Sequence, residues 1–217
     1  MSLSVVINTK NAAATIEKCL KSVKFADEIV VVDMHSEDET VAIAQKYTDN
    51  IYAYKDVGFA DPARNFALSK AHSDWILIVD ADEVVPTKLA ERISAIVSLP
   101  SQTQAYYIAR KNLIWGQWIK HTGWWPDYQL RLFQKGVINY PAKIHTKPTP
   151  PAETDFLPAN EDYALIHHNY PTISSFIQRM DRYSSLTSAT KQKFDAITAL
   201  DQFVQEFWGR FFVEQGY

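Results

Sequence analysis

Four stretches in the first eighty residues are apolar at most positions, and polar or turn-forming residues separate them. Short continuous apolar runs of this kind are typical of strands that are buried on both faces of a sheet. The sequence therefore predicts strands at Leu3–Thr9, at Glu28–Asp33, at residues 50–54 and at residues 75–80.

The segments between and after these strands have features of helices. Ser36 and Glu39 form a capping box, and Asp61 with Pro62 supplies an N-cap followed by a first-turn proline. Because strands and helices alternate strictly, we expect an α/β fold with a mainly parallel sheet and helices on both faces. The predicted helices cover residues 15–23, 36–47, 61–71 and 87–97.

The alternation ends after residue 98. Residues 105–110 and 128–140 have the composition of strands, and the Lys-Gly pair inside the second segment predicts a hairpin. Residues 147–158 are a proline-rich loop, and the pattern from Ile173 onward is helical. We therefore divide the chain into residues 1–98, residues 99–170 and residues 171–217.

Composition narrows the class of protein. The chain has 217 residues, a net charge of −3 and a pI of about 6.1, which does not fit a general nucleic-acid binder. Its single cysteine, Cys19, lies in a helical pattern and is expected to be a buried structural thiol in a reducing compartment. We expect neither a signal peptide nor a membrane-spanning helix, which needs about 18 apolar residues.

Polar side chains gather where the predicted strands end. Thr9 and Asn11 follow the first strand, Asp33 ends the second, and Asp80 and Asp82 end the fourth. The carboxyl ends of parallel strands share one edge, where ligands bind in open α/β sheets. Clustered carboxylates repel one another and require a cation or a proton, and Mg²⁺ or Mn²⁺ can bridge a carboxylate to a diphosphate. An Asp-x-Asp on extended backbone would point both carboxylates the same way. A solvated acidic loop is the alternative, and the buried strand before it favours the metal site.

In these strand-end residues and in the motifs around them, the chain resembles family 2 glycosyltransferases with the GT-A fold. Within that family it is most similar to the bacterial branch that includes lipopolysaccharide-core glucosyltransferases. The resemblance implies a small antiparallel acceptor-side region and C-terminal helices beside the parallel sheet. It assigns residues 1–98 to nucleotide-sugar binding, 99–170 to the acceptor side and 171–217 to a helical segment. The motifs that carry it are residues 4–11, 26–40, 63–85, 123–136 and 165–185.

The resemblance also implies roles for individual residues. Asp82 would bind the metal directly, Asp80 would be a second metal residue or lie near the ribose or a metal-bound water, and Asp127 would be the general base. Arg131 would contact the donor or stiffen the site, and Glu83 is a weaker candidate for the base. The residues that would line the nucleotide-sugar pocket are Thr9, Asn11, Asp33, Arg64, Asn65, Asp80 and Arg131.

The function that these roles imply is an inverting, metal-dependent hexosyl transfer. The donor would be a nucleotide sugar, with UDP as the expected nucleotide, and the acceptor a cell-envelope glycan or a lipid-linked sugar. The cofactor would be Mn²⁺ or Mg²⁺, in the cytoplasm or at the inner face of the membrane. A metal-dependent nucleotidyltransferase is one alternative, but the segment after the first strand lacks the glycines of a phosphate loop. A non-catalytic nucleotide-sugar-binding module is the other, and the presence of both Asp82 and Asp127 argues against it.

Two positions depart from the family pattern. Met34 stands where many members carry a second aspartate, which makes uridine less certain as the base. His145 is followed by threonine instead of glutamate. His145 remains a candidate ligand for a metal or a phosphate, and His167 and His168 compete with it for that role.

Aromatic residues are concentrated in the second half of the chain. Their rings would either stack on acceptor sugars or form core, and we expect one or two of the clustered tryptophans to be core. The aromatic segment 203–217 is expected to pack on the domain, and contact with a membrane is the alternative. The clustered tryptophans are Trp115, Trp118, Trp124 and Trp125.

Overall fold

The structure is a computed structural model that forms two compact units. It describes residues 1–55, 61–121, 123–141, 148–178 and 181. The first unit contains Met1–Arg110 and Tyr128–His167, and the second contains Lys111–Asp127 and His168–Tyr217. We describe each unit by itself.

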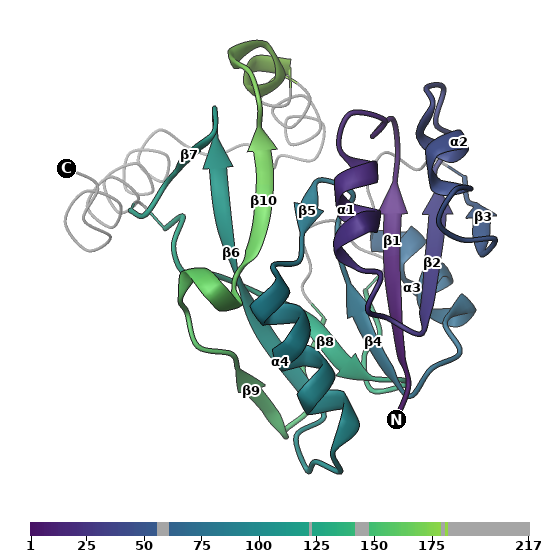
Figure 1. Ribbon diagram of the computed structural model, residues 1–217, viewed down its shortest axis with the longest axis vertical. Coiled ribbons are helices and arrows are strands. Elements are labelled where there is room, and N and C mark those ends of the chain that lie inside the picture. Colours follow the sequence, from purple (N-terminus) through teal and green to yellow (C-terminus); the bar gives the residue numbers. More distant parts are fainter. Residues whose placement is uncertain (56–60, 122, 142–147, 179–180, 182–217) are drawn as a thin grey trace, which may run out of the picture. The chain divides into compact units, whose positions relative to one another are not determined.

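Four parallel strands form one side of the sheet in the first unit. They lie in the order β3-β2-β1-β4, so that β1 pairs with both β2 and β4 (Figure 1). Their bounds confirm the four predicted strands, with β3 and β4 shorter at their ends than expected. The strands are β1 (Leu3–Thr9), β2 (Glu28–Asp33), β3 (Ile51–Ala53) and β4 (Trp75–Ile78).

Helices cover both faces of this sheet. Side chains alternate along β1, so that Val5 and Ile7 pack with the cluster that holds α1, α2 and α4, and Val6 packs with α3. Figure 1 shows α1 and α4 in front of the strands. The predicted α/β arrangement is therefore confirmed. The helices are α1 (Ile16–Ser22), α2 (Thr40–Ala44), α3 (Asp61–Lys70) and α4 (Thr87–Ser98).

The predicted capping box does not form. Helix α2 begins at Thr40 with Glu39 as its N-cap, and no side-chain cap bond is made. The Ser36 hydroxyl instead donates to Asp33 Oδ1 at 2.5 Å, and the Ser36 N–H donates to Asp33 Oδ2 at 3.0 Å. Ser36 thus binds the strand-end carboxylate, and the helix starts four residues later than predicted.

The other side of the sheet is formed by later strands. The order continues from β4 as β8-β6-β10-β5, with β4 and β8 antiparallel. The predicted hairpin is wrong, because residues 137–141 form no strand and β8 already has a neighbour on each side. The elements not yet named are β5 (Glu83–Val84), β6 (Ala105–Ile114), β7 (Gln117–Trp118), β8 (Asp127–Gln134), β9 (Thr154–Phe156), β10 (Leu165–Tyr170) and the short 3-10 helix η1 (Glu161–Tyr163).

The core of the first unit includes the one cysteine and a tryptophan. Trp75 on β4 is fully buried, and its ring lies 6.1 Å from that of Tyr106. Cys19 on α1 is also fully buried, and burial raises the pKa of its thiol well above the usual range. Cys19 is therefore a structural residue, as predicted.

In the second unit, the end of β6 and β7 form a short antiparallel ribbon. Leu113 pairs with Trp118, and the turn between them places Trp115 and Gly116 at φ 50° and 77°. Trp115, Trp118, Trp124 and Trp125 are all at least partly exposed, so the expectation that one or two of them are core is wrong. They lie on the ribbon and its neighbouring turn, which are not part of the two apolar clusters.

The C-terminal part of the chain is described only at its start. Residues 173–178 are helical, as predicted, and the aromatic segment 203–217 lies outside the described residues. Within the described ranges, no helix has both the length and the apolar character that crossing a membrane requires.

Candidate active site

The loops after β1 and β2 are joined by hydrogen bonds at the carboxyl edge of the sheet. The Asn11 N–H donates to Ser36 Oγ at 2.8 Å, and Ser36 in turn is bonded to Asp33. Asn11 Oδ1 accepts from the Glu37 N–H at 2.8 Å. Asn11 adopts a φ of 50°, which asparagine tolerates better than most residues. Ser36 therefore connects two of the predicted nucleotide-binding residues, and sequence reasoning had assigned it only a helix cap.

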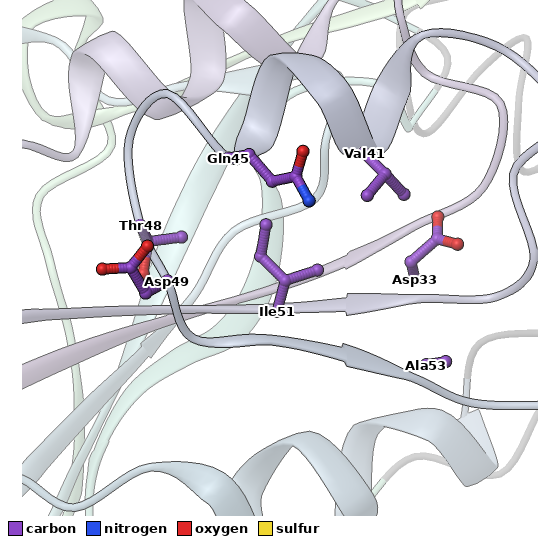
Figure 2. A pocket seen from close by; sticks show the side chains of 7 residues that line it. All are labelled: Asp33, Val41, Gln45, Thr48, Asp49, Ile51 and Ala53. Atoms are coloured by element: carbon purple, nitrogen blue, oxygen red, sulfur yellow. The ribbon is translucent and has the colours of Figure 1, made fainter.

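Asp33 also lines a pocket of about 330 Å³ beside β2 and β3. Figure 2 shows Val41 of α2 and Gln45, the residue that caps α2, reaching toward it, and Ile51 opposite them. Asp33 is the only predicted nucleotide-binding residue among those that line it. The pocket therefore extends the strand-end site toward α2.

The end of β1 carries buried polar atoms that lack partners. Asn8 is 9% exposed, and both of its amide atoms have no hydrogen-bond partner among the described residues; the same holds for Thr9 Oγ1. A buried polar group without a partner costs about 1–3 kcal/mol, so such atoms are usually satisfied by a ligand or by bound water. Thr9 was predicted as a site residue. Asn8 was missed, and its signal is an amide inside an otherwise apolar strand.

The chain turns sharply after β4. Ala81 and Asp82 lie in a turn, so the expected extended Asp-x-Asp backbone is wrong. The Glu83 N–H donates to the Asp80 carbonyl at 2.9 Å, and the Asp80 N–H donates to Glu83 Oε2 at 2.9 Å. Glu83 thus closes the turn, and the carboxylates of Asp80 and Asp82 have different neighbours.

Arginines surround two of the three carboxylates. Arg131 donates to Asp80 Oδ2 at 2.6 Å and to Glu83 Oε1 at 2.7 Å. Arg64 lies 3.4 Å from Asp80 Oδ1, and Arg110 lies 3.7 Å from Glu83 Oε1. Glu83 is 0% exposed and Arg131 3% exposed. The acidic run after β4 is therefore largely a buried ion-pair network, and a buried carboxylate of this kind needs such partners.

The pKa directions follow from this network. Burial raises the pKa of Asp80, but the charges of Arg131 and Arg64 outweigh it and hold that pKa well below its usual range. Burial raises the pKa of Glu83, and neighbouring Asp80 adds to this against the opposing charge of Arg131. Burial lowers the pKa of Arg131, and the two carboxylates more than offset this. Asp80 and Arg131 consequently form a charged pair.

Asp82 has a different surrounding. Its side chain is 26% exposed, and Oδ2 lies 3.5 Å from Nε2 of His167. Asp82 and His167 come together because β5 pairs with β10. This pairing places His167 opposite Glu83, the residue next to Asp82. His168 belongs to the second unit, and His145 lies outside the described residues.

Asp82 and His167 fit a divalent cation that also binds a ligand. The described residues contain no group of three or more histidine, cysteine, aspartate or glutamate side chains that could hold a metal. Mg²⁺ and similar ions, however, commonly take only one or two protein ligands and complete their shell with phosphate oxygens and water. A carboxylate beside an imidazole is therefore a sufficient donor set for a metal–diphosphate complex.

The side chain of Asn65 forms hydrogen bonds to the backbone of Tyr140. Its Nδ2 donates to the Tyr140 carbonyl at 2.7 Å, and its Oδ1 accepts from the Tyr140 N–H at 2.8 Å. The guanidinium of Arg64 lies 5.3 Å from the centre of the Tyr140 ring. Asn65 thus positions Tyr140 against Arg64.

The second unit contains Asp127 at the start of β8. Its Oδ2 accepts from Asn112 Nδ2 at 3.0 Å, and Asn112 Nδ2 also lies 3.2 Å from the Trp124 carbonyl. Asn112 is 1% exposed, so the amide is held in place. The hydrogen bond from Asn112 orients the carboxylate. Sequence reasoning missed Asn112.

Known proteins resemble the chain in sequence and in fold. An uncharacterized glycosyltransferase of Rickettsia bellii is 40% identical over 108 residues, which is 49% of this chain and 36% of that protein. The lipopolysaccharide core biosynthesis glycosyltransferase LpsC of Rhizobium meliloti is 26% identical over 198 residues, covering 86% of this chain and 70% of LpsC. The crystal structure of S. aureus TarS residues 1–349 aligns with a TM-score of 0.57 at 20% identity, over 98% of this chain and 72% of that one.

These comparisons settle the fold and the family. The match to TarS confirms the GT-A arrangement of a curled, mostly parallel sheet. The chain spans only about a third of the length of the Rickettsia relatives. The sequence model of glycosyl transferase family 2 matches residues 4–181, and the chain therefore belongs to that family.

Proposed function

We propose that the protein transfers a hexose from a nucleotide sugar, with UDP as the nucleotide, to a hydroxyl of a cell-envelope glycan or lipid-linked acceptor. The turn after β4 carries the proposal, because arginines surround Asp80 and Glu83 whereas Asp82 faces His167. Two relatives support the substrate classes: TarS has been solved with UDP-GlcNAc, and LpsC is named for lipopolysaccharide core biosynthesis. Residues 1–98 would bind the donor and residues 99–170 the acceptor.

The nucleotide would bind at the ends of β1 and β2. Asp33 can accept hydrogen bonds from a base or a ribose, and its link to Ser36 fixes its orientation. Thr9 supplies a buried hydroxyl without a partner among the described residues, and Asn11 shapes the loop beside it. Arg64 would add a positive charge to the donor pocket, where Asn65 holds Tyr140 against it.

The metal would bind at Asp82 and His167. When bound, Mn²⁺ or Mg²⁺ neutralises charge on the diphosphate leaving group. Asp80 would contribute by positioning Arg131, since both belong to one ion-pair network with Glu83. These buried residues would keep the turn rigid while the donor binds and the nucleotide leaves.

Asp127 would be the general base. Its carboxylate removes the proton from the acceptor hydroxyl while that oxygen forms a bond to the anomeric carbon of the donor sugar. The bond between the anomeric carbon and the diphosphate oxygen breaks, and the nucleoside diphosphate leaves with the electron pair. A single displacement of this kind inverts the anomeric configuration. Asn112 would hold the carboxylate in orientation during the transfer.

Two other functions fit the protein less well. Membership of glycosyl transferase family 2 argues against a nucleotidyltransferase. A non-catalytic module that only binds nucleotide sugars would have no need for a carboxylate held as Asp127 is by Asn112. We place the reaction in the cytoplasm or at the inner face of the membrane, where nucleotide sugars are available.

Replacement of Asp82 by alanine tests the metal assignment. The Asp82→Ala protein should bind UDP-glucose with the same affinity in Mn²⁺ as in EDTA, because the carboxylate that holds the ion is gone. Calorimetric titration of UDP-glucose in the two buffers measures the difference. In wild-type protein, Mn²⁺ should strengthen binding.

A matched control is Asp155→Ala, which removes an exposed carboxylate on β9 of the same unit. Its gain in affinity from Mn²⁺ should equal that of the wild type. A folded Asp82→Ala protein that keeps the full gain would contradict the assignment of Asp82 to the metal.

A further inference from the structure

The ribbon of β6 and β7 in the second unit carries two lysines against one tryptophan. The Lys111 Nζ lies 4.5 Å from the centre of the Trp118 ring, and the Lys120 Nζ lies 4.1 Å from it. The register explains why: Trp118 is opposite Leu113, so Lys111, two residues before Leu113 on β6, and Lys120, two residues after Trp118, lie on its side of the ribbon. Trp118 therefore has two ammonium groups close to its ring.

The two ammonium groups repel each other, and the indole ring offsets part of that repulsion. An anion that bound beside the ring would be attracted by both. Residues 111–126 contain these two lysines and no acidic residue, although the whole chain has a net charge of −3. This stretch thus carries positive charge within an acidic protein, and the nearest carboxylate along the chain after it is that of Asp127.

Aromatic groups lie beside the two lysines. Trp115, in the turn between β6 and β7, is 54% exposed, and its backbone N–H donates to the Tyr170 carbonyl at 2.8 Å. Trp125 meets Trp118 edge-on at 5.0 Å, and the Trp118 Nε1 is buried without a partner among the described residues. An exposed indole on a backbone that is held by a hydrogen bond is suited to the apolar face of a sugar ring.

The proposed base, at the start of β8, is hydrogen-bonded to this ribbon. Asn112 follows Lys111 on β6 and donates to the Asp127 carboxylate, and Trp125 precedes Asp127 by two residues. The pair of lysines and the carboxylate are therefore built on one small scaffold within the second unit.

We propose that Lys111, Lys120 and Trp118, together with Trp115, form an acceptor subsite for a sugar that carries an anionic group. The shared chemistry is a pyranose with an attached phosphate monoester or carboxylate: the lysines bind the anion and Trp115 contacts the ring. The proposal rests on the proposed function, because it names the class of acceptor that Asp127 would deprotonate.

The indole N–H signals of ¹⁵N-labelled full-length protein provide a site-specific test. Glucose 6-phosphate, glucuronic acid, glucose and inorganic phosphate are titrated separately, with the signals of Trp115 and Trp118 assigned from Trp→Phe variants. At least one of the two anionic sugars should shift these signals at concentrations where glucose and inorganic phosphate do not. A larger effect of glucose 6-phosphate identifies a phosphate, and a larger effect of glucuronic acid a carboxylate.

Charge-removing variants complete the test. Lys111→Gln and Lys120→Gln should each weaken binding of the anionic sugar roughly two- to fivefold, as expected for partly exposed charges. Lys18→Gln, at an exposed lysine on α1, should change nothing. The proposal is overturned if glucose or inorganic phosphate binds as well as both anionic sugars, or if neither lysine change weakens binding.

The donor site is measured separately. UDP-glucose is titrated into the same wild-type protein and into both lysine variants, and its affinity should be equal in all three. A wild-type protein that binds the anionic sugar but no nucleotide sugar contradicts the proposed function. A wild-type protein that binds UDP-glucose but neither anionic sugar contradicts only this inference.

Discussion

The Asp127→Asn protein should transfer sugar about 10²–10⁴-fold more slowly than the wild type, with nearly the same affinity for the donor. Asparagine keeps an oxygen that can accept from Asn112 Nδ2, which lies 3.0 Å from the carboxylate in the wild type. The substitution therefore removes the basicity of the group and preserves its shape. Turnover per folded molecule, donor affinity by calorimetry and the melting temperature are measured together.

A structural role for Asp127 would give the opposite pattern. A turn residue after Pro126 would lower the melting temperature when replaced and leave turnover per folded molecule nearly intact. Near-normal transfer by folded Asp127→Asn protein would rule out Asp127 as the base. Asp162 would then be tested, since its carboxylate is half exposed beside Lys88, whereas Glu83 is fully buried against Arg131.

The Arg131→Met protein should lose about 3–5 kcal/mol of the free energy of unfolding. Arg131 neutralises Asp80 and the fully buried Glu83, and methionine leaves both carboxylates without this partner. Urea denaturation followed by circular dichroism measures the change. The matched control is Arg92→Met at an exposed position of α4, which should change the free energy by less than about 0.5 kcal/mol.

A second substitution separates charge from packing. Glu83→Gln removes one of the two carboxylates that Arg131 contacts, so the double variant Arg131→Met, Glu83→Gln should be more stable than Arg131→Met alone. If Arg131→Met lowers the free energy of unfolding by no more than Arg92→Met does, the buried network does not hold the turn after β4. The role proposed for Asp80 through Arg131 would then fail as well.

Most of the first unit could be predicted from the sequence because its strands are buried on both faces. Strands β1 and β2 have the predicted bounds, since an unbroken apolar run leaves little freedom in where a buried strand begins and ends. Strands β5 and β9 have two and three residues, too few to produce a periodic pattern. The hairpin prediction was wrong because local turn signals do not reveal that β4 pairs with β8.

The candidate site was predicted in part for the same reason. Strand ends are visible in the sequence, so Asp33 and Asp82 could be placed at the edge of the sheet. Their partners could not be, because the pairing depends on the fold: Arg131 bonds to Glu83 across 48 positions of the chain. Asn112, 15 positions from Asp127, gives no signal in the sequence that distinguishes it from a surface amide.

The central claim is that the carboxyl edge of β1, β2 and β4 binds a metal–nucleotide complex. The most direct test is the anomalous scattering of Mn²⁺ in crystals of the protein grown with MnCl₂ and UDP. We predict one manganese peak within bonding distance of Asp82 and His167, with UDP phosphate oxygens on the same ion and the nucleoside next to Asp33. A manganese–UDP complex bound at any other place on the chain, or UDP bound at Asp33 with no ion beside Asp82, would contradict the account.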